Sequence, residues 1–260
     1  MRVLVTGATG QFGRALAQAA RAPGVVLRLQ GRGAAAPDWA VPFEWASADF
    51  TDGRGVTEAV TGVDAIVHAA SDPARAAEVD VEGTRRLAAA AAVHSVAHLL
   101  YISVVGVDRI PHPYYRHKLA AEEIVAGGRV RWSILRLTQF HSFVAHIIKR
   151  GARAPFAILL PTRFRFQNVD LADAAARTLR ALAEGPGGRL PDYGGPEVLT
   201  LAEAAATWRR VRRVRKPIVN LPMFGARAAA FRAGFNTAPD GERGAVTFAD
   251  WLVQRYTRAP

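Results

Sequence analysis

The sequence of 260 residues contains no cysteine, which excludes several classes of structure and chemistry. Disulfide bonds, thiolate metal sites and thiol nucleophiles all require a residue that is missing. The seven histidines show no metal-ligand spacing with carboxylates, so we expect no bound metal ion. A chain without cysteine also fits a reducing compartment, and we expect the protein to be cytoplasmic.

Long apolar runs are absent as well. No stretch approaches the roughly 20 apolar residues that span a bilayer, and we expect no membrane partner. Half of the residues (50%) are nevertheless hydrophobic, which is enough for a substantial core. Length and composition together fit one α/β domain with an appended lobe.

Lysine is scarce in a strongly basic chain. Only 3 of the 34 basic residues are lysines, and the net charge is +12. The densest basic run, residues 209–216, fits either a solvated basic helix end or a patch that binds phosphate or nucleic acid. No DNA-reading motif accompanies this run. We therefore expect no specific nucleic-acid partner and only weak, non-specific binding.

The first twenty residues carry the most informative pattern. Residues 3–5 form a short apolar run typical of a buried strand, residues 6–13 form a glycine-rich turn, and a helical pattern follows. Three glycines at this spacing allow a sharp turn, close approach of a pyrophosphate, and close packing of helix on strand. The turn residues expected to contact a dinucleotide are Gly7, Thr9, Gly10, Gln11, Phe12 and Gly13.

Short apolar segments then alternate with helical ones through the first half of the chain. The predicted strands cover residues 2–6, 25–30, 43–46, 64–69, 98–103 and 131–136. The predicted helices cover residues 11–22, 75–94 and 114–127. This alternation predicts an α/β fold with a doubly wound parallel sheet, a Rossmann core over residues 1–150.

The regular alternation of predicted strands and helices ends after residue 136. Helices are predicted at 140–150, 170–184, 201–213, 223–233 and 244–256, with short strands at 156–160 and 165–169. They predict a smaller C-terminal α+β substrate lobe over residues 151–260, partly interleaved with the core.

Arg32 follows the second predicted strand, and no acidic residue occurs between Arg21 and Pro37. At this place an acidic residue binds the ribose 2′-hydroxyl of NAD, whereas an arginine accommodates the 2′-phosphate of NADP. A guanidinium binds phosphate through paired hydrogen bonds. We therefore predict NADP (NADPH) as the cofactor, with Arg14 as a second candidate for phosphate contact.

Two further groups of residues follow predicted strands, where ligands bind in open α/β sheets. After the third strand, Asp49 is either an acceptor for the adenine amino group or a simple turn residue. Small residues after the fourth strand let a dinucleotide lie close to the backbone. The residues of these two groups predicted to contact the cofactor are Asp49, Phe50, Ala69, Ala70 and Ser71.

A catalytic constellation is predicted from Ser103, Tyr114 and Lys118. Tyr114 and Lys118 are four residues apart, so they share one helix face. A phenol has a pKa of about 10, which a neighbouring ammonium lowers. Tyr114 is the predicted acid/base, Lys118 its activator and Ser103 the hydroxyl that orients the substrate oxygen. Tyr115 is an alternative to Tyr114.

Several of these segments together resemble the short-chain dehydrogenase/reductase superfamily, in particular its atypical NmrA-like branch. The matching segments are residues 5–13, 80–84, 102–106, 114–118, 135–141, 194–197 and 231–234. The resemblance implies that Lys118 also contacts the nicotinamide ribose. Asp80 is a departure, because many extended members have an asparagine there. Gln139, Phe140 and His141 follow the sixth predicted strand and are the expected substrate-pocket residues.

These observations predict an NADP-dependent oxidoreductase. It would transfer hydride to or from a small, rather apolar carbonyl or quinone-like substrate, as a monomer or homodimer. One alternative is a non-catalytic regulatory protein of the NmrA type that senses NADP. The other is an NADP-dependent epimerase or dehydratase, which would show no net consumption of its cofactor.

Overall fold

The computed structural model describes residues 1–20 and 24–257. The chain divides into two compact units that interleave along the sequence. The first unit comprises Met1–Ser103, Pro113–Arg136 and Ala175–Leu190, and the second comprises Val104–His112, Leu137–Ala174 and Pro191–Pro260. The boundary between the units is therefore not a single division at residue 150, since residues 175–190 belong to the first unit.

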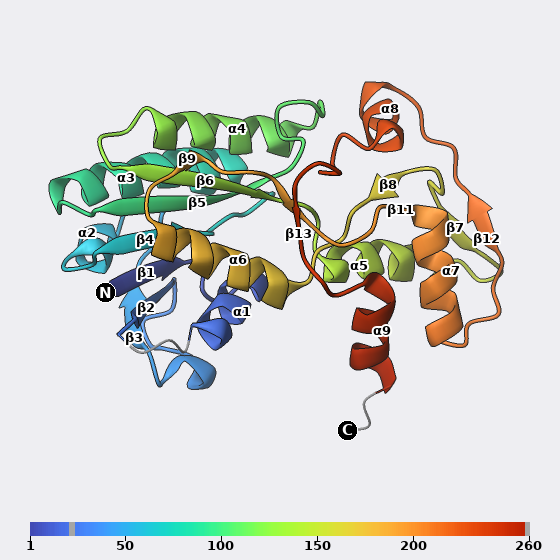
Figure 1. The fold of residues 1–260 in the computed structure, drawn as a ribbon, viewed down its shortest axis with the longest axis horizontal. Coiled ribbons are helices and arrows are strands. Elements are labelled where there is room, and N and C mark those ends of the chain that lie inside the picture. Colours follow the sequence, from blue (N-terminus) through green and yellow to red (C-terminus); the bar gives the residue numbers. More distant parts are fainter. Residues whose placement is uncertain (21–23, 258–260) are drawn as a thin grey trace. The chain divides into compact units, whose positions relative to one another are not determined.

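The sheet of the first unit has the strand order β6-β5-β4-β1-β2-β3 (Figure 1). Its strands are β1 (Arg2–Thr6), β2 (Val26–Gly31), β3 (Glu44–Ser47), β4 (Ala65–His68), β5 (His98–Val104) and β6 (Trp132–Leu137). β1 pairs in parallel with both β2 and β4, and the pairs β2–β3 and β4–β5 are also parallel. Every predicted strand of this sheet is confirmed to within one residue at each end. The strand order reverses between β1 and β4, which is where such sheets bind ligands.

Helices cover both faces of this sheet (Figure 1). The structure has α1 (Gln11–Ala19), η1 (Asp38–Ala40), α2 (Val56–Val60), the π-helical turn η2 (Ala77–Glu82), α3 (Gly83–Val93), α4 (Pro113–Ala126) and α6 (Leu171–Glu184). Residues of α2, α3 and α4 pack with Leu4, Ile66 and Leu99 in one core cluster, while α1 and α6 lie on the other face. The predicted doubly wound fold is therefore confirmed. Positions 21 and 22 of the predicted helix 11–22 lie outside the described residues.

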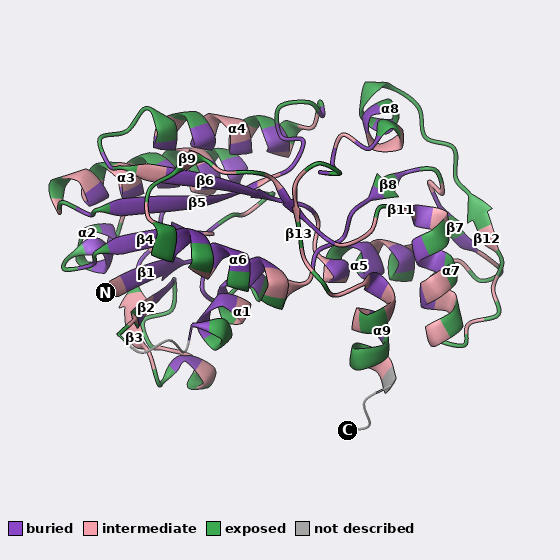
Figure 2. Cartoon of the chain, in the orientation of Figure 1, coloured by how far each residue is buried: buried purple, intermediate pink, exposed green. Residues whose placement is uncertain are grey.

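The strands are buried on both faces, as their continuous apolar sequences require. Val3, Leu4 and Val5 have no exposed surface, and the central strands are coloured as buried along their length (Figure 2). Burial on both faces is typical of parallel sheets covered by helices. Polar side chains at the strand ends are the ones left to bind ligands.

The second unit packs four helices with short strand pairs among its described residues. The helices are α5 (His141–Gly151), α7 (Leu201–Val211), α8 (Ala226–Ala233) and α9 (Phe248–Thr257). The strand pairs are β7 (Ile158–Leu160) with β12 (Ile218–Asn220), β8 (Arg165–Phe166) with β11 (Leu199–Thr200), and β10 (Tyr193–Gly194) with β13 (Glu242–Arg243), while β9 (Gly188–Arg189) pairs with β6 in the first unit. α7 begins at a capping box, in which Thr200 and Glu203 bond each other's backbone N–H groups. In the part of the chain described, no helix combines the length and the hydropathy that a membrane span needs.

Candidate functional site

The glycine-rich loop between β1 and α1 requires glycine at two positions. Gly7 has φ of 66°, in the left-handed region, and a Cβ there would lie 2.7 Å from Ala70 Cα. At Gly13 a Cβ would lie 2.6 Å from Ala8 Cα. Side chains at these positions would separate the loop from β4 and α1 from β1, as the spacing of the glycines predicts.

Two buried polar residues fix this loop to the neighbouring strands. The Gln30 side chain accepts a hydrogen bond from Gly7 N (3.1 Å) and donates one to Ala48 O (2.6 Å). Thr6 Oγ1 accepts from the backbone N–H groups of Ala69 (3.1 Å) and Ala70 (3.2 Å). These bonds connect the carboxyl ends of β1, β2, β3 and β4. Sequence reasoning missed both residues, although a glutamine within an apolar strand is itself a signal of a buried polar contact.

The start of α1 fits a bound phosphate. Gly10 is its N-cap and provides no side-chain cap, and the first turn contains no acidic residue. The positive end of the helix dipole is therefore not balanced by a side chain of this turn. Arg14 donates to Thr9 O (3.1 Å), and its guanidinium lies 5.1 Å from the centre of the Trp39 ring. The second candidate for phosphate contact is thus engaged within the protein.

Arg32 is exposed and lies one residue beyond β2. Hydrogen bonds from Thr51 are the main cause of a lowered pKa at Asp49, and the charge of Arg32 contributes to the same lowering. Asp49 Oδ1 accepts from the Thr51 N–H (2.9 Å) and hydroxyl (2.7 Å), the geometry of a turn residue. The Phe50 ring is buried and packs edge-on against His68. Arg32 is therefore an exposed cation at this edge, directly after β2 as the sequence predicts.

A neutral histidine connects the loop to the π-helical turn η2. His68 Nδ1 lies 2.7 Å from Thr6 Oγ1, and His68 Nε2 lies 2.9 Å from Thr84 Oγ1. Thr84 in turn donates to the carbonyl oxygen of Asp80. Burial, together with the charge of Lys118, lowers the pKa of His68 to about 3, so the ring is neutral at physiological pH. This chain of contacts was not predicted from the sequence.

Helix α4 brings Tyr114 and Lys118 to the carboxyl edge of the sheet. The Tyr114 hydroxyl lies 2.8 Å from Ser71 Oγ, just beyond β4. Lys118 Nζ donates to Ile102 O in β5 (2.9 Å) and lies 3.7 Å from Asp80 Oδ1. The predicted shared face of Tyr114 and Lys118 is therefore placed beside the predicted cofactor residues.

The ionisation of this pair differs from the prediction. Burial, followed by the negative charge of Asp80, raises the pKa of Tyr114 above that of an ordinary phenol. Burial lowers the pKa of Lys118 to about 8, against the opposing effect of Asp80 and Glu122. The prediction that Lys118 lowers the pKa of Tyr114 is wrong for the protein alone, because the ammonium group is directed to Asp80 and to a backbone carbonyl. Tyr114 is consequently protonated at neutral pH and suited to donate a proton.

Three buried polar atoms of β5 and η2 lack a hydrogen-bond partner within the described part of the chain. Among the described residues, Ser103 Oγ, Tyr101 Oη and Asp80 Oδ1 are buried and have no hydrogen-bond partner. Lys118 Nζ lies 4.1 Å from the centre of the Tyr101 ring. Buried polar atoms normally have a hydrogen-bond partner. The missing partners therefore indicate a site at which a polar ligand or water molecules form these hydrogen bonds.

The three predicted substrate-pocket residues lie in the second unit. Gln139 Oε1 accepts a hydrogen bond from Asn236 Nδ2 (3.0 Å), and the backbone of Phe140 pairs with Val169. His141 is 1% exposed, and its Nε2 lies 3.0 Å from Val246 O. His141 thus contributes to the core of its own unit. Substrate contact by these residues stays a prediction.

Comparisons with known proteins agree with this geometry. A family model described as NAD(P)H-binding matches residues 7–153. The (4-alkanoyl-5-oxo-2,5-dihydrofuran-3-yl)methyl phosphate reductase of Streptomyces griseus is 31% identical over 212 residues, which cover 80% of this chain and 73% of that protein.

Solved structures share the fold at lower identity. An NADPH-dependent quinone oxidoreductase of Escherichia coli, complexed with NADPH, has a TM-score of 0.77 at 17% identity and covers 98% of this chain and 99% of that one. A short-chain dehydrogenase/reductase superfamily protein from Agrobacterium tumefaciens, with bound NAD, has a TM-score of 0.74 at 22% identity, covering 99% and 96%. Both nucleotides therefore occur on this fold. Within the described ranges, no three histidine or carboxylate side chains are grouped as metal ligands.

Proposed function

Because the chain belongs to the NAD(P)H-binding family, we propose that it is an NADPH-dependent oxidoreductase of the short-chain dehydrogenase/reductase type that acts on small carbonyl or quinone-like substrates. One observation supports this proposal above the others. Helix α4 holds Tyr114 against Ser71 and Lys118 against Ile102 O, beside the glycine-rich loop. A proton donor and a cation thus lie at the edge of the sheet where the family binds its nucleotide.

Backbone groups of the glycine-rich loop, the exposed Arg32 and the buried Lys118 would hold the nucleotide. The loop at Gly7, Gly10 and Gly13 and the start of α1 suit the pyrophosphate, and Arg32 suits a 2′-phosphate. When bound, the nicotinamide supplies or accepts the hydride. Lys118 is the residue that the family resemblance assigns to the nicotinamide ribose. The hydrogen bond from its Nζ to Ile102 O, near the end of β5, supports that assignment.

Tyr114 would act as a general acid on the substrate oxygen. Its raised pKa keeps the phenol protonated at neutral pH, so it can donate a proton as negative charge develops on that oxygen. The Ser71 hydroxyl hydrogen-bonds the phenol oxygen and can stabilise it after proton loss. The unpartnered Ser103 hydroxyl is available for one further hydrogen bond.

The substrate class is supported by the printed name of the Streptomyces griseus relative. The name of that protein gives it as a reductase of a dihydrofuranylmethyl phosphate whose ring carries an oxo group and an alkanoyl group. A small molecule with a carbonyl next to an apolar chain is therefore the first class to test. A protein acid such as Tyr114 suits such a substrate, because its oxygen must gain a proton as carbon gains hydride.

The test is NADPH consumption with a panel of quinones, enones and alkanoyl lactones. We expect turnover with at least one of them, and Tyr114→Phe should reduce that turnover by roughly 10²- to 10⁴-fold while NADPH affinity is kept. Tyr115→Phe is the matched control and should keep most of the activity. Tight NADPH binding with no turnover would instead favour the regulatory alternative. Substrate conversion without net NADPH consumption would favour the epimerase or dehydratase.

A further inference from the structure

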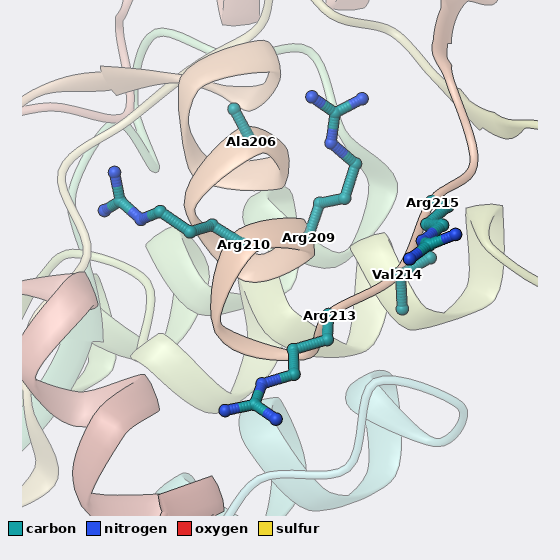
Figure 3. Close-up of a pocket in the computed structure, with 6 residues that line it drawn as sticks. All are labelled: Ala206, Arg209, Arg210, Arg213, Val214 and Arg215. Atoms are coloured by element: carbon teal, nitrogen blue, oxygen red, sulfur yellow. The ribbon is translucent and has the colours of Figure 1, made fainter.

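The C-terminal end of α7 carries an arginine-lined hollow in the second unit (Figure 3). Its volume is about 640 Å³. We call it the arginine pocket, and its lining residues are Ala206, Arg209, Arg210, Arg213, Val214 and Arg215. It coincides with the basic run at residues 209–216. The sequence alone fits two interpretations of this run, a solvated helix end or a phosphate-binding patch.

Part of the basic run has a structural role. Lys216 Nζ donates to Ala152 O (2.9 Å) and Ala154 O (2.8 Å), which ties the segment after α7 to the end of α5. The Arg212 guanidinium lies 4.3 Å from the centre of the Tyr256 ring, and Arg209 donates to Lys216 O (3.4 Å). These contacts fix the backbone of the run and explain three of its cations.

The other cations of the run, Arg210, Arg213 and Arg215, are exposed and have no such role. Over residues 1–20 and 24–257, no ion pair joins any of the three to a carboxylate, whereas Arg28 and Arg54 each pair with one. The helix dipole favours cations in the last turn of α7, which accounts for Arg210. It does not account for Arg213 and Arg215, which lie beyond the helix.

The backbone conformation of Arg213 also suggests that this side chain has a role other than stability. Its φ is 53°, and Val214 N donates back to Arg209 O (3.0 Å), as in a helix end that normally places glycine at the left-handed position. An arginine there is strained where glycine would not be. Stability therefore does not explain the choice of this side chain.

The arrangement of the guanidinium groups indicates the kind of ligand. Figure 3 shows the arginine side chains pointing in different directions from the end of α7, so they cannot all close on one phosphate. The only apolar members of the lining are Ala206 and Val214, which offer no aromatic surface for base stacking and no large wedge for a bilayer. The second unit also carries 17 basic and 9 acidic side chains. We propose that the arginine pocket binds the phosphodiester backbone of nucleic acid, without base selectivity.

The first experiment compares two triple variants of equal charge change. Binding of a labelled mixed-sequence DNA duplex is measured by fluorescence anisotropy between about 50 and about 200 mM salt. Arg210→Glu/Arg213→Glu/Arg215→Glu should weaken binding at least tenfold and reduce the salt slope by roughly 2 to 3, since each phosphate contact contributes about 0.9. The control Arg129→Glu/Arg131→Glu/Arg227→Glu changes three other exposed arginines. It should weaken binding less than about threefold, and equal losses in both variants would reduce the effect to net charge and overturn the proposal.

Two further measurements exclude misfolding and a membrane partner. Arg213→Gly removes one guanidinium and relieves the strained backbone, so it should raise the melting temperature while weakening duplex binding. Unchanged duplex binding by this variant contradicts a role for Arg213. Vesicles of phosphatidylcholine with phosphatidylserine serve as competitor. If they displace the duplex at lower phosphate concentration than unlabelled DNA does, the surface is a membrane site and the proposal fails.

Discussion

Asp80 and Lys118 bury opposite charges in the first unit, with 0% and 3% of their side chains exposed. A buried ion pair is weak evidence for stability, because desolvation offsets much of its attraction. Its clearer effect is on protonation: Asp80 raises the pKa of Lys118 against burial, and it also raises the pKa of Tyr114. In the proposed reaction Asp80 is thus a positioning residue that sets the charges on α4.

Asp80→Asn tests this role through pH dependence. Without the carboxylate, the pKa of Lys118 should fall below about 8, and the ammonium form should be lost at lower pH. We expect the alkaline limb of the kcat/KM profile to move down by about one pH unit. Glu82→Gln is the control, since Glu82 lies in the same π-helical turn but is exposed and pairs with the exposed Arg85. An alkaline limb that stays in place in Asp80→Asn would contradict the assignment.

Arg32→Ala tests the choice of nucleotide. The exposed guanidinium after β2 should give NADPH at least a tenfold advantage over NADH, about 1.4 kcal/mol. The variant should lose this preference while its NADH affinity changes little, as measured by calorimetric titration with both nucleotides. Arg14→Ala should keep the preference, because Arg14 is engaged with Thr9 and Trp39. Equal affinities in the unaltered protein would refute the NADPH assignment.

Single residues were predictable where their role depends on local geometry. Gly7 and Gly13 follow from the tight turn itself, and Tyr114 and Lys118 follow from helical spacing. Gln30 and His68 were missed because their partners come from other strands and helices. The predicted direction of the Tyr114 pKa shift was wrong for the same reason: burial of the phenol, and after it the charge of Asp80, depend on tertiary packing.

Among the secondary-structure elements, the strands of the first unit were easiest to predict. Apolar runs of four to seven residues bounded by turn residues have few alternatives in this setting. The helix predicted over residues 75–94 instead consists of η2 and α3. A π-helical turn inserts an extra residue, and such turns are frequent at functional sites. Here the turn contains the buried Asp80.

Gly13→Ala tests the contact between α1 and β1. The added Cβ would lie 2.6 Å from both Ala8 Cα and Gly7 O, so backbone must shift. We expect a loss of unfolding free energy of roughly 1–3 kcal/mol, as for other overpacked sites, together with at least tenfold weaker NADPH binding. Chemical denaturation and calorimetry measure the two effects. Gly127→Ala, at the exposed end of α4, is the control and should change neither strongly.

Two buried neutral histidines contribute to the response of the protein to acid. Burial is the main cause of the pKa values of about 3 at His68 and about 4 at His98. Each histidine has an unfolded pKa near 6.5, so the unfolded chain binds these protons first as pH falls. The contribution of the two neutral histidines to the unfolding free energy is fully present above about pH 6.5. It decreases as the pH falls toward their pKa values in the folded protein.

Urea denaturation between about pH 6.5 and pH 5 measures this effect. The unfolding free energy should fall by up to about 1.4 kcal/mol per pH unit for each histidine. His68→Gln should reduce the slope of the unfolding free energy against pH by the share of one proton taken up on unfolding. This holds even if the variant is less stable at neutral pH. His146→Gln, at an exposed site, should leave the slope unchanged. An unchanged slope in His68→Gln would contradict the buried neutral histidine.

The alternation of strands and helices predicted the parallel sheet of the first unit. It did not predict that residues 175–190 complete that unit, because the return depends on long-range packing of α6 and β9. The helices after residue 136 and the strands β7 and β8 were predicted, with α7 beginning after Thr200 as expected, but the strands β9 to β13 were not. Its short strand pairs depend on partners far apart in sequence, which local pattern cannot identify.

The interleaving of the two units also affects synthesis of the chain on the ribosome. The first segment of the first unit is Met1–Ser103, yet its last segment ends at Leu190. The first unit therefore cannot acquire all of its native contacts until that late segment has emerged. Incomplete chains that stop near residue 150 expose the sheet surface that α6 covers in the finished protein, which makes them targets for chaperones and proteases.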